Sequence, residues 1–297
     1  MSELPQKPVF RFAPSPNGAL HLGHAYSALL NEQLARKTDG RLLLRIEDID
    51  QTRCTPALEA QMISDLAWLG LDFAPPHRRQ SDHFEDYRQA LDQLIGRGLA
   101  YPAFMSRGDI RAWIGDQERE TGKPWPRDPD GAPIYPALDR HLSASAREAR
   151  IASGEPFAWR LDMEAALAMV GEELSWLETG EGPSGAHDII AAEPAVWGDV
   201  MLARRDTPTS YHLSVVVDDA LQGVTDVVRG RDLFFATAIH RLLQHLLSLA
   251  APRYHHHRLI LGDDGTKLSK SKGDTGIAAL RDAGIDPVTI RIKLGFR

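Results

Sequence analysis

The N-terminal part of the chain alternates short apolar runs with stretches of helical periodicity. Residues 9–12 form an apolar run that stops before Pro14 and Pro16, and this predicts a short strand. Apolar side chains then recur at helical spacing until Gly40, and residues 41–46 have the pattern of a second, buried strand. This order predicts a βαβ unit at the start of an α/β domain.

The same periodicity predicts further elements downstream. Thr55 and Pro56 can begin a helix, a second helix is expected from near Ser81 to Gly96, and a strand begins at Leu99. Residues 102–193 differ, because prolines, glycines and charges interrupt the pattern there, and we interpret this stretch as an inserted subdomain. Beyond it we expect core segments at 211–219 and 226–230, a helix over 233–249 and a strand over 258–261.

Composition narrows the function classes. Hydrophobic residues make up 43% of the chain and no apolar run is long enough to cross a membrane, so we expect a cytoplasmic protein without membrane contact. The lone Cys54 can build neither an internal disulfide nor a cysteine zinc site. The net charge of −7 disfavours indiscriminate nucleic-acid binding, so any RNA must meet a local basic patch. Candidate patches, which could equally be scattered solvated charges, are Arg229 with Arg231, Arg253 with Arg258, and Lys267 with Lys270 and Lys272.

The sequence His21-Leu22-Gly23-His24 stands at the expected start of a helix. Its two imidazoles are three residues apart, so they project from one face of the helix, and Gly23 leaves room for a ligand between them. Backbone N–H groups and the helix dipole favour a polyphosphate at this end. A purely structural histidine pair is the alternative, and zinc is less favoured because no third ligand accompanies the pair.

A second motif, Lys267-Leu268-Ser269-Lys270-Ser271, lies in a glycine-bounded loop near the C-terminus. Glycine hinges would let this loop close over a triphosphate, where an ammonium could meet the charge that develops on a pyrophosphate leaving group. A solvated charged turn is the alternative. Together with the histidine motif, this loop predicts the two halves of one ATP site.

The two motifs resemble the HIGH and KMSKS signatures of class I aminoacyl-tRNA synthetases. The resemblance covers the whole chain, most weakly over about 105–195, and its glutamyl type is indicated by residues 11–16, 45–50, 211–219 and 228–233. It implies an α/β fold with a Rossmann-like, doubly wound parallel sheet and an inserted α+β subdomain. The implied divisions are a first catalytic half at 8–101, an inserted acceptor-binding-like subdomain at 102–193, a second half at 194–257, and the loop with a short C-terminal segment at 258–297.

The resemblance also implies the residues of the site. Catalysis would rest on His21, His24 and Lys270, with ATP and Mg²⁺ as cofactors and no protein ligands to a metal. The ATP-binding residues would be His21, Gly23, His24, Lys267, Ser269 and Lys270. The glutamate pocket would be lined by Arg11, Phe12, Ala13, Pro14, Ser15, Glu47, Tyr211 and Arg229.

The chemistry of these pocket residues agrees with that assignment. Glu47 can hold the ammonium of glutamate, and an arginine can grip a carboxylate with two parallel hydrogen bonds. Arg11 and Arg229 are the candidates, and the sequence leaves open which carboxylate each of them meets. An acidic loop at 47–50 that binds nothing, or that binds Mg²⁺, is the alternative.

The number of residues after the Lys-Ser motif bears on which molecule would receive the glutamate. Only 26 residues follow Ser271, which leaves no room for an anticodon-binding domain. This resembles the glutamyl-queuosine branch of the family, and it implies activation of L-glutamate without tRNA and its transfer to the queuosine base in the anticodon loop of tRNA(Asp), by a monomer. The alternatives are a truncated glutamyl-tRNA synthetase, another glutamate-adenylating enzyme, or an inactive RNA-binding paralogue.

The insertion departs from the family pattern, which often includes a zinc site. Ala103, Met105 and Asp139 stand where zinc-binding thiols would be expected, beside the retained Tyr135, so we expect no structural zinc. Apolar packing that involves Phe104, Trp113 and Trp125 would then hold this subdomain. The consecutive His255, His256 and His257 diverge, so we expect a solvated approach to a strand rather than a metal site.

Overall fold

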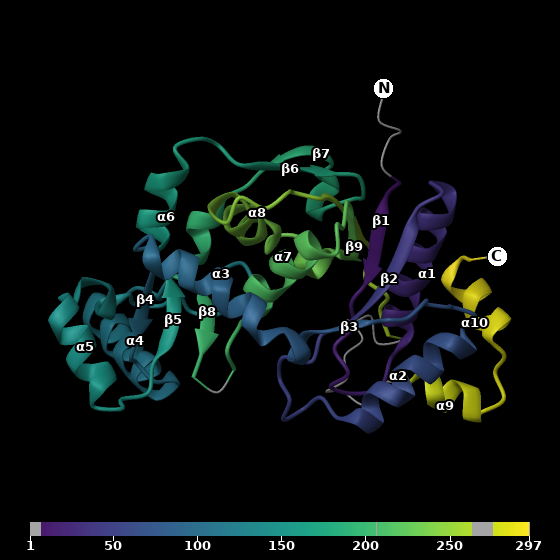
Figure 1. Ribbon diagram of the computed structural model, residues 1–297, viewed down its shortest axis with the longest axis horizontal. Coiled ribbons are helices and arrows are strands. Elements are labelled where there is room, and N and C mark those ends of the chain that lie inside the picture. Colours follow the sequence, from purple (N-terminus) through teal and green to yellow (C-terminus); the bar gives the residue numbers. More distant parts are fainter. Residues whose placement is uncertain (1–6, 206, 263–275, 297) are drawn as a thin grey trace.

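The larger of two sheets has seven strands in the order β3-β2-β1-β9-β10-β6-β7 (Figure 1). This computed structural model describes residues 7–205, 207–262 and 276–296. Neighbouring strands are parallel except for β6 and β7, which are antiparallel. The strands are β1 (Val9–Phe12), β2 (Arg41–Ile46), β3 (Arg78–Arg79), β6 (Ser175–Glu178), β7 (Asp188–Ala191), β9 (Asp226–Gly230) and β10 (Arg253–His257).

The strand order confirms the predicted doubly wound α/β fold. From β1 the chain adds β2 and β3 on one side, and later β9 and β10 on the other, so the winding reverses between β1 and β9. Ligands of such sheets bind beyond the carboxyl ends of the strands at this switch point. Arg11 and Phe12 end β1, while Arg229 and Gly230 end β9, so these residues border the expected site.

Helices cover both faces of the large sheet (Figure 1). Phe10 and Val228 pack with Ala35 of α1, whereas the preceding Val9 and Val227 belong to a different apolar cluster, because successive strand residues point to opposite faces. The surrounding helices are α1 (Leu22–Lys37), α2 (Pro56–Trp68), η1 (Gln80–His83), α3 (Phe84–Gly96), η4 (Pro194–Trp197), α7 (Tyr211–Leu221), η5 (Arg231–Leu233), α8 (Thr237–Leu246), α9 (Ile277–Asp282) and α10 (Pro287–Leu294). Within the described ranges, no helix has the length and apolar character of a membrane span.

A smaller antiparallel sheet and its helices form the opposite end of the molecule (Figure 1). Its strands are β4 (Ala100–Ala103), β5 (Ala158–Leu161) and β8 (Met201–Arg204). The accompanying helices are α4 (Arg107–Thr121), η2 (Leu138–His141), α5 (Ala144–Ala152) and α6 (Met163–Val170), and η3 (Pro183–Gly185) precedes β7. Their arrangement agrees with the predicted α+β insertion.

Some strands cross the predicted divisions of the chain. β4, which includes the strand expected from Leu99, pairs with β5 rather than with the large sheet. β6 and β7, which come from the stretch 102–193, belong to the large sheet. The boundaries at 101, 193 and 257 stay predictions.

Two predictions near β10 are wrong. The strand expected over 258–261 is instead β10, which ends at His257. His256 and His257 are buried rather than solvated, because β10 lies inside the sheet between β9 and β6. Sequence patterning failed here because an imidazole can be buried when both of its nitrogens find partners, as those of His256 do. Arg229 is also buried, so it cannot belong to a surface RNA patch.

The positions where the resemblance implied zinc ligands lie together between β4 and η2. Ala103 and Tyr135 pack in one apolar cluster with Met105 beside them. The buried Asp139 carboxylate accepts hydrogen bonds from the Phe104 N–H at 2.9 Å and the Tyr135 hydroxyl at 2.5 Å. This donor set does not fit zinc, because two of the positions offer no suitable ligand and the carboxylate already has partners.

Aromatic and ionic contacts hold this region. The rings of Trp113 and Trp125 meet edge to face with centroids 4.9 Å apart, which agrees with the expected apolar packing. Arg150 donates to Asp139 at 3.2 Å and lies over the Phe104 ring, 4.1 Å from its centroid. That the subdomain folds without zinc stays a prediction.

Replacing Asp139 with alanine tests this prediction. The variant leaves the Phe104 N–H and the Tyr135 hydroxyl without their acceptor, and each buried orphan costs about 1–3 kcal/mol. We therefore expect a clearly lower Tm in thermal unfolding, whereas alanine at the exposed Asp116 should change little. A chelator should leave the wild-type Tm unchanged. Stoichiometric zinc in the purified protein, or a wild-type Tm that falls with chelator, would contradict the prediction.

Candidate active site

A cavity of about 820 Å³ opens at the switch point between β1 and β9. It contains every predicted site residue that the structure describes. These are Arg11, Phe12, Ala13, Pro14, Ser15, His21, Gly23, His24, Glu47, Tyr211 and Arg229. The predicted Lys267, Ser269 and Lys270 lie outside the described residues. None of the lining residues comes from the stretch 100–205, so the described wall of this cavity belongs to the large sheet and its connections.

The two histidines cap α1 with their rings. The His21 Nδ1 accepts from the Gly23 N–H at 3.1 Å, and the His24 Nδ1 accepts from the His21 N–H, also at 3.1 Å. The ring centroids are 3.8 Å apart. Since each Nδ1 acts as an acceptor, a neutral ring at either position carries its proton on Nε2. A side chain at position 23 would begin 3.0 Å from the His21 ring, so it would fit only if that ring shifted.

Both described flanks of the Lys-Ser loop lie at this cavity. Leu259 and Ile260 line it on one side of the loop. On the other side, Gly276 forms a β-bridge with His21, and the Ile277 N–H donates to the Leu20 carbonyl at 2.7 Å. The chain that follows the loop is therefore joined to the histidine motif through backbone contacts, whereas the Lys-Ser motif itself lies outside the described residues.

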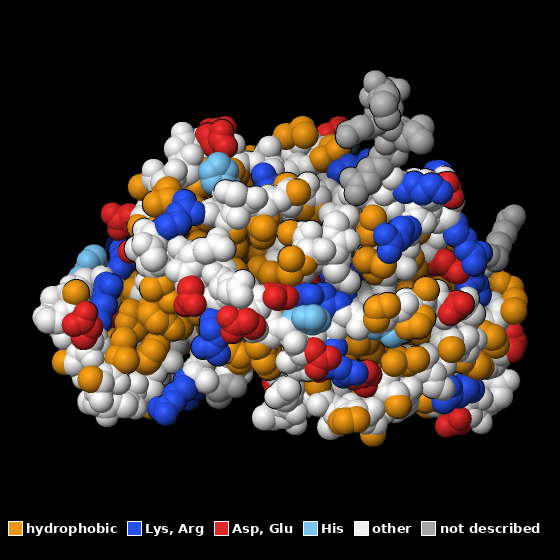
Figure 2. Space-filling model, in the orientation of Figure 1, with side chains coloured by type: hydrophobic (Ala, Val, Ile, Leu, Met, Phe, Trp, Pro, Cys, Tyr) orange, Lys and Arg blue, Asp and Glu red, His pale blue; other side chains and the backbone are white. Residues whose placement is uncertain are grey.

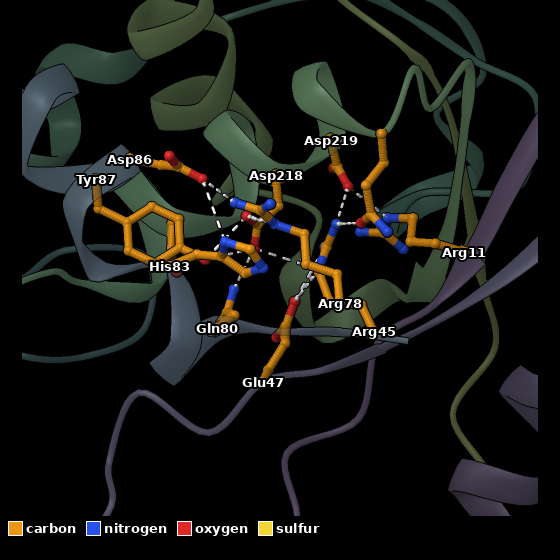
Figure 3. A network of polar contacts seen from close by, with 12 residues as sticks. Arg11, Arg45, Glu47, Arg78, Gln80, His83, Asp86, Tyr87, Asp218 and Asp219 are labelled. Carbon is orange, nitrogen blue, oxygen red and sulfur yellow. Dashed lines mark hydrogen bonds and ion pairs between the residues drawn. The ribbon is translucent and has the colours of Figure 1, made fainter. Parts of the chain in front are cut away.

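A buried ion network holds the floor of the cavity (Figure 3). Asp219 of α7 accepts from the Arg11 Nε at 3.0 Å and from the Arg45 Nη1 at 2.7 Å through the same oxygen. The Arg45 Nη2 donates to the Glu47 Oε1 at 3.0 Å. The Ser210 side chain caps α7 by accepting from the Leu213 N–H, and so fixes the helix that carries Asp219.

The network shows which atoms of Arg11 and Glu47 already have hydrogen-bond partners among the described residues. Arg11 is only 4% exposed, yet none of the described residues accepts a hydrogen bond from its two Nη atoms. The Glu47 Oε2 likewise has no donor within the described chain, because Arg45 contacts only Oε1. One guanidinium edge and one carboxylate oxygen therefore remain for a ligand that carries opposite charges.

Burial sets the protonation of these groups. It raises the pKa of the Glu47 carboxyl, although Arg45 and Arg11 oppose that shift. For Arg45, burial alone would lower the pKa, but Asp219, Glu47 and Asp218 outweigh it and raise the pKa above its ordinary value. For Asp219, burial favours the neutral acid, but Arg11 and Arg45 outweigh it and lower the pKa. The charged forms of Arg45 and Asp219 therefore stabilise each other, whereas burial works against the charge on Glu47.

Arg229 is held differently, because all five of its N–H donors have partners within the protein. Its Nε donates to the His256 Nε2 at 3.1 Å, and its Nη1 lies 3.0 Å from the His240 Nδ1 and 3.4 Å from the Tyr211 hydroxyl. Its Nη2 donates to the Thr237 hydroxyl at 2.8 Å and to the Leu233 carbonyl at 3.1 Å. A bound carboxylate would have to take the place of one of these partners, of which Tyr211 is the most distant.

These contacts fix the tautomers of two buried histidines. An arginine Nε can only donate, so the His256 Nε2 accepts, and its Nδ1 donates to the Glu178 Oε2 at 2.5 Å. The His240 Nδ1 accepts from Arg229 in the same way, and its Nε2 then donates to the His212 Nδ1 at 3.2 Å. Both rings must be neutral for Arg229 to keep its position.

A second cavity, of about 540 Å³, adjoins the first. The two share Ser15, Asn17, Glu47, Arg53 and Tyr211. Its other walls come from three parts of the chain. These are Ile49, Asp50 and Gln80 of the first catalytic half, then Asp128, Asp130, Ala132, Pro133, Tyr135 and Arg160 of the insertion, and lastly residues between 197 and 212. Glu47 and Tyr211 thus stand where one cavity passes into the next.

Sequence reasoning missed the residues that support the site rather than line it. Among these are Arg45, Glu178, Asp219, His240 and His256. Asp218, also missed, accepts from Arg78, Gln80 and Tyr87 and so ties η1 and α3 to α7. A signal was present, because charged residues inside otherwise apolar runs, such as Arg45 in β2, need a buried partner.

The comparison with protein families agrees with this geometry. The family described as tRNA synthetases class I (E and Q), catalytic domain, matches residues 8–295. The chain belongs to this family. It is therefore a ligase-type enzyme, as the paired motifs predicted.

Two similar proteins, both matched over most of their length, have a name more specific than that of the family. The glutamyl-Q tRNA(Asp) synthetase of Rhodobacter capsulatus is 46% identical over 97% of this chain and 100% of its own length. The glutamyl-Q tRNA(Asp) synthetase of Symbiobacterium thermophilum is 39% identical over 96% of this chain and 85% of its own length. The glutamate–tRNA ligase of Aquifex aeolicus is 36% identical over 93% of this chain, but over only 54% of its own length.

Solved structures show the same fold. The glutamate tRNA ligase of Elizabethkingia meningosepticum, crystallised in complex with its amino acid, matches 91% of this synthetase and 53% of its own chain, with a TM-score of 0.72 and 25% identity. The glutamate-tRNA synthetase of Elizabethkingia anophelis gives a TM-score of 0.73 at the same identity.

The neutral histidines behind Arg229 predict acid sensitivity. Burial lowers the pKa of His212 and of His256 to about 4, and it lowers that of His240 well below the ordinary value. The unfolded chain takes up these protons below about pH 6.5 while the folded protein does not, so each histidine removes roughly 1 kcal/mol of stability per pH unit between about 6.5 and 4. Denaturant unfolding at pH 7 and pH 5 should show this loss. Replacing His256 with glutamine should make the loss smaller, and equal stability of the wild type at both pH values would contradict the prediction.

Proposed function

We propose that this synthetase activates L-glutamate with ATP, without tRNA, and transfers the glutamyl group to the queuosine base in the anticodon of tRNA(Asp). The observation that carries the proposal is the first cavity. The Nη edge of Arg11, the Glu47 Oε2 and the two histidines that cap α1 all belong to residues that line it. Two full-length relatives that bear the name glutamyl-Q tRNA(Asp) synthetase support the choice of acceptor. The enzyme would act in the cytoplasm as a monomer.

Glutamate carries one ammonium and two carboxylates, and the cavity offers partners for each. The Glu47 Oε2 would hold the ammonium, and the Nη edge of Arg11 would grip a carboxylate with two hydrogen bonds. Burial raises the pKa of Tyr211, so its hydroxyl stays protonated and can donate to the other carboxylate beside Arg229. The Nη groups of Arg11 have no hydrogen-bond partner among the described residues, whereas all donors of Arg229 are engaged. Arg11 would therefore bind a carboxylate of glutamate more strongly than Arg229.

The nucleotide would lie over the start of α1. His21 and His24 would donate from Nε2 to phosphate oxygens, and Gly23 would let the chain of phosphates approach the helix. Lys267, Ser269 and Lys270 would contribute from the loop whose flanks border the cavity. Mg²⁺ would arrive with the nucleotide; the described residues include no cluster of three metal ligands, and we assign the ion no step.

The reaction has two steps. A carboxylate oxygen of glutamate attacks the α-phosphorus of ATP, the bond to the bridging oxygen breaks, and pyrophosphate leaves with that electron pair. The protein contributes by aligning the two substrates and by placing fixed positive charge where negative charge moves. A hydroxyl of the acceptor then attacks the glutamyl carbonyl, loses its proton and expels AMP.

The second cavity would receive the acceptor. It adjoins the glutamate pocket at Glu47 and Tyr211, so a hydroxyl that reaches this boundary could meet the activated carbonyl. Transfer to a tRNA 3′ end, as the glutamate–tRNA ligase relatives would suggest, is the second candidate.

Replacing Glu47 with glutamine tests the glutamate pocket. Losing a buried charge partner typically costs about 2–5 kcal/mol, so we expect the KM for glutamate to rise by roughly thirtyfold or more while the KM for ATP changes little. Glutamate-dependent exchange of pyrophosphate into ATP measures both constants. Glutamine at the exposed Glu85, which does not line the cavity, is the matched control. An unchanged KM for glutamate would remove Glu47 from the pocket.

The proposed acceptor is tested by separating activation from transfer. We expect glutamate-dependent exchange without tRNA, and transfer of labelled glutamate only to tRNA(Asp) that carries queuosine in place of guanosine in its anticodon. Charging of a 3′ end, or transfer that ignores queuosine, would favour a truncated glutamate–tRNA ligase. RNA binding without exchange would indicate an inactive paralogue.

A further inference from the structure

A buried carboxylate lies between α2 and α9, and it lines neither cavity of the active site. Asp65 of α2 is 0% exposed and shares the buried face of that helix with Met62 and Leu66. Neither of its oxygens accepts a hydrogen bond from the described residues. Its one ionic partner among them is Arg281 of α9, whose Nη1 lies 3.2 Å from the Asp65 Oδ1. A buried carboxylate is costly unless it is paired, so its presence here requires an explanation.

The charge on Asp65 depends on the position of α9. Figure 1 shows α9 beside α2, at the end of the molecule that carries the C-terminus. The exposed surface of this corner mixes acidic, basic and hydrophobic side chains (Figure 2), so water can hydrate the charges there, but Asp65 is not part of that surface. Burial raises the pKa of the Asp65 carboxyl, and Arg281, whose side chain is 32% exposed, opposes that shift. Only a helix that keeps Arg281 in place supplies this opposing charge.

The start of α9 contacts the nucleotide half of the active site. Ile277, one helical turn before Arg281, is fully buried and packs in the apolar cluster that contains Leu20. The Ile277 N–H donates to the Leu20 carbonyl at 2.7 Å, and Gly276 forms the β-bridge with His21. The position of α9 therefore acts directly on the backbone of His21, whose ring caps α1.

A second ion pair attaches the C-terminal segment at a different point. Arg291 of α10 donates from Nη2 to the Glu32 Oε2 at 3.3 Å and from Nη1 to the Leu69 carbonyl at 3.2 Å. Glu32 is also buried, but it lies about three turns further along α1 than His21. This pair fixes α10 against the body of α1, whereas the pair of Asp65 fixes the helix whose start contacts Leu20 and His21.

We propose that Asp65 and Arg281 are positioning residues for the nucleotide. Their ion pair would hold α9 where its start fixes the Leu20 carbonyl and the backbone of His21, and would thereby hold the rings of His21 and His24 in the geometry that phosphate needs. Neither residue would touch a substrate. The inference rests on the proposed ATP site at the start of α1.

Replacing Asp65 with asparagine tests the pair, because the amide keeps the shape of the side chain and removes its charge. Coupling between two sites typically amounts to about five- to 150-fold, so we expect the Kd for ATP, measured by calorimetry, to rise at least about fivefold. The kcat of pyrophosphate exchange should fall at least about tenfold, since a misplacement of about 1 Å can cost about a hundredfold in rate. The KM for glutamate should not change, because Arg11 and Glu47 belong to a different part of the cavity wall.

Variants of Arg281 provide a second, independent arm at a partly exposed position. Arg281→Gln should reproduce the effect of Asp65→Asn, whereas Arg281→Lys, which keeps the positive charge, should retain most of the ATP affinity. The double variant Asp65→Asn/Arg281→Gln should be no worse than either single variant, because each removes the same interaction. Glu32→Gln is the matched control. It breaks the other buried pair, so it should lower the Tm without changing the Kd for ATP.

Three results would overturn the proposal. These are a wild-type Kd for ATP in both Asp65→Asn and Arg281→Gln, a rise in the KM for glutamate parallel to that in the Kd for ATP, and an equal loss of ATP affinity in Glu32→Gln. The last two would show that general destabilisation is enough. If the wild type binds ATP but catalyses no glutamate-dependent exchange, the proposed function fails, while the Kd values for ATP still decide the role of the pair.

Discussion

One carboxylate, that of Asp219, determines the shape of the active site. It is buried between Arg11 at the end of β1 and Arg45 in β2, and it reaches them from α7, which lies far along the chain. A buried charge without partners would be very costly, so the three residues can exist only together. The contact therefore fixes α7 against the carboxyl ends of two parallel strands. Because Arg45 also grips Glu47, the same carboxylate indirectly sets the direction of the ligand-facing oxygen on Glu47.

This arrangement gives two arginines of one pocket different roles. Arg11 uses its Nε for Asp219 and keeps its Nη edge toward the cavity, so it can form new bonds without losing old ones. All N–H groups of Arg229 donate to neighbouring protein groups. One of these groups is the His256 ring, whose tautomer is fixed by its hydrogen bond to Glu178. We propose the first as a ligand-binding group, whereas the second is a positive charge that its partners hold in a defined position. Preorganised charge of this kind needs no rearrangement when a carboxylate approaches.

The sequence predicted the fold from local patterns, whereas the residues of the glutamate pocket came from the family resemblance, and the structure places the described ones in one cavity. Apolar runs and turn residues located β1, α1 and β2, and the histidine motif marked the start of α1. The supporting shell could not be predicted in the same way. Asp219 and Arg45 are 174 positions apart, and only the tertiary fold brings them together. The strand β10 was predicted at the wrong residues for a related reason. Three consecutive histidines do not have the pattern of a buried strand, and only the partners of His256 explain its burial.

The distribution of lining residues supports the proposed activation of glutamate without RNA. The cavity that gathers Arg11, Glu47 and the capping histidines takes no described wall from residues 100–205, so a subdomain that moved or lacked its RNA would leave that wall intact. The second cavity, by contrast, takes part of its wall from the insertion, and it shares Ser15, Asn17, Glu47, Arg53 and Tyr211 with the first. An enzyme that needed RNA to complete its glutamate pocket would be expected to build that pocket from the RNA-facing subdomain. The separation seen here instead suits the proposed intermediate, which would form in the first cavity and then meet an acceptor at the boundary that the two cavities share.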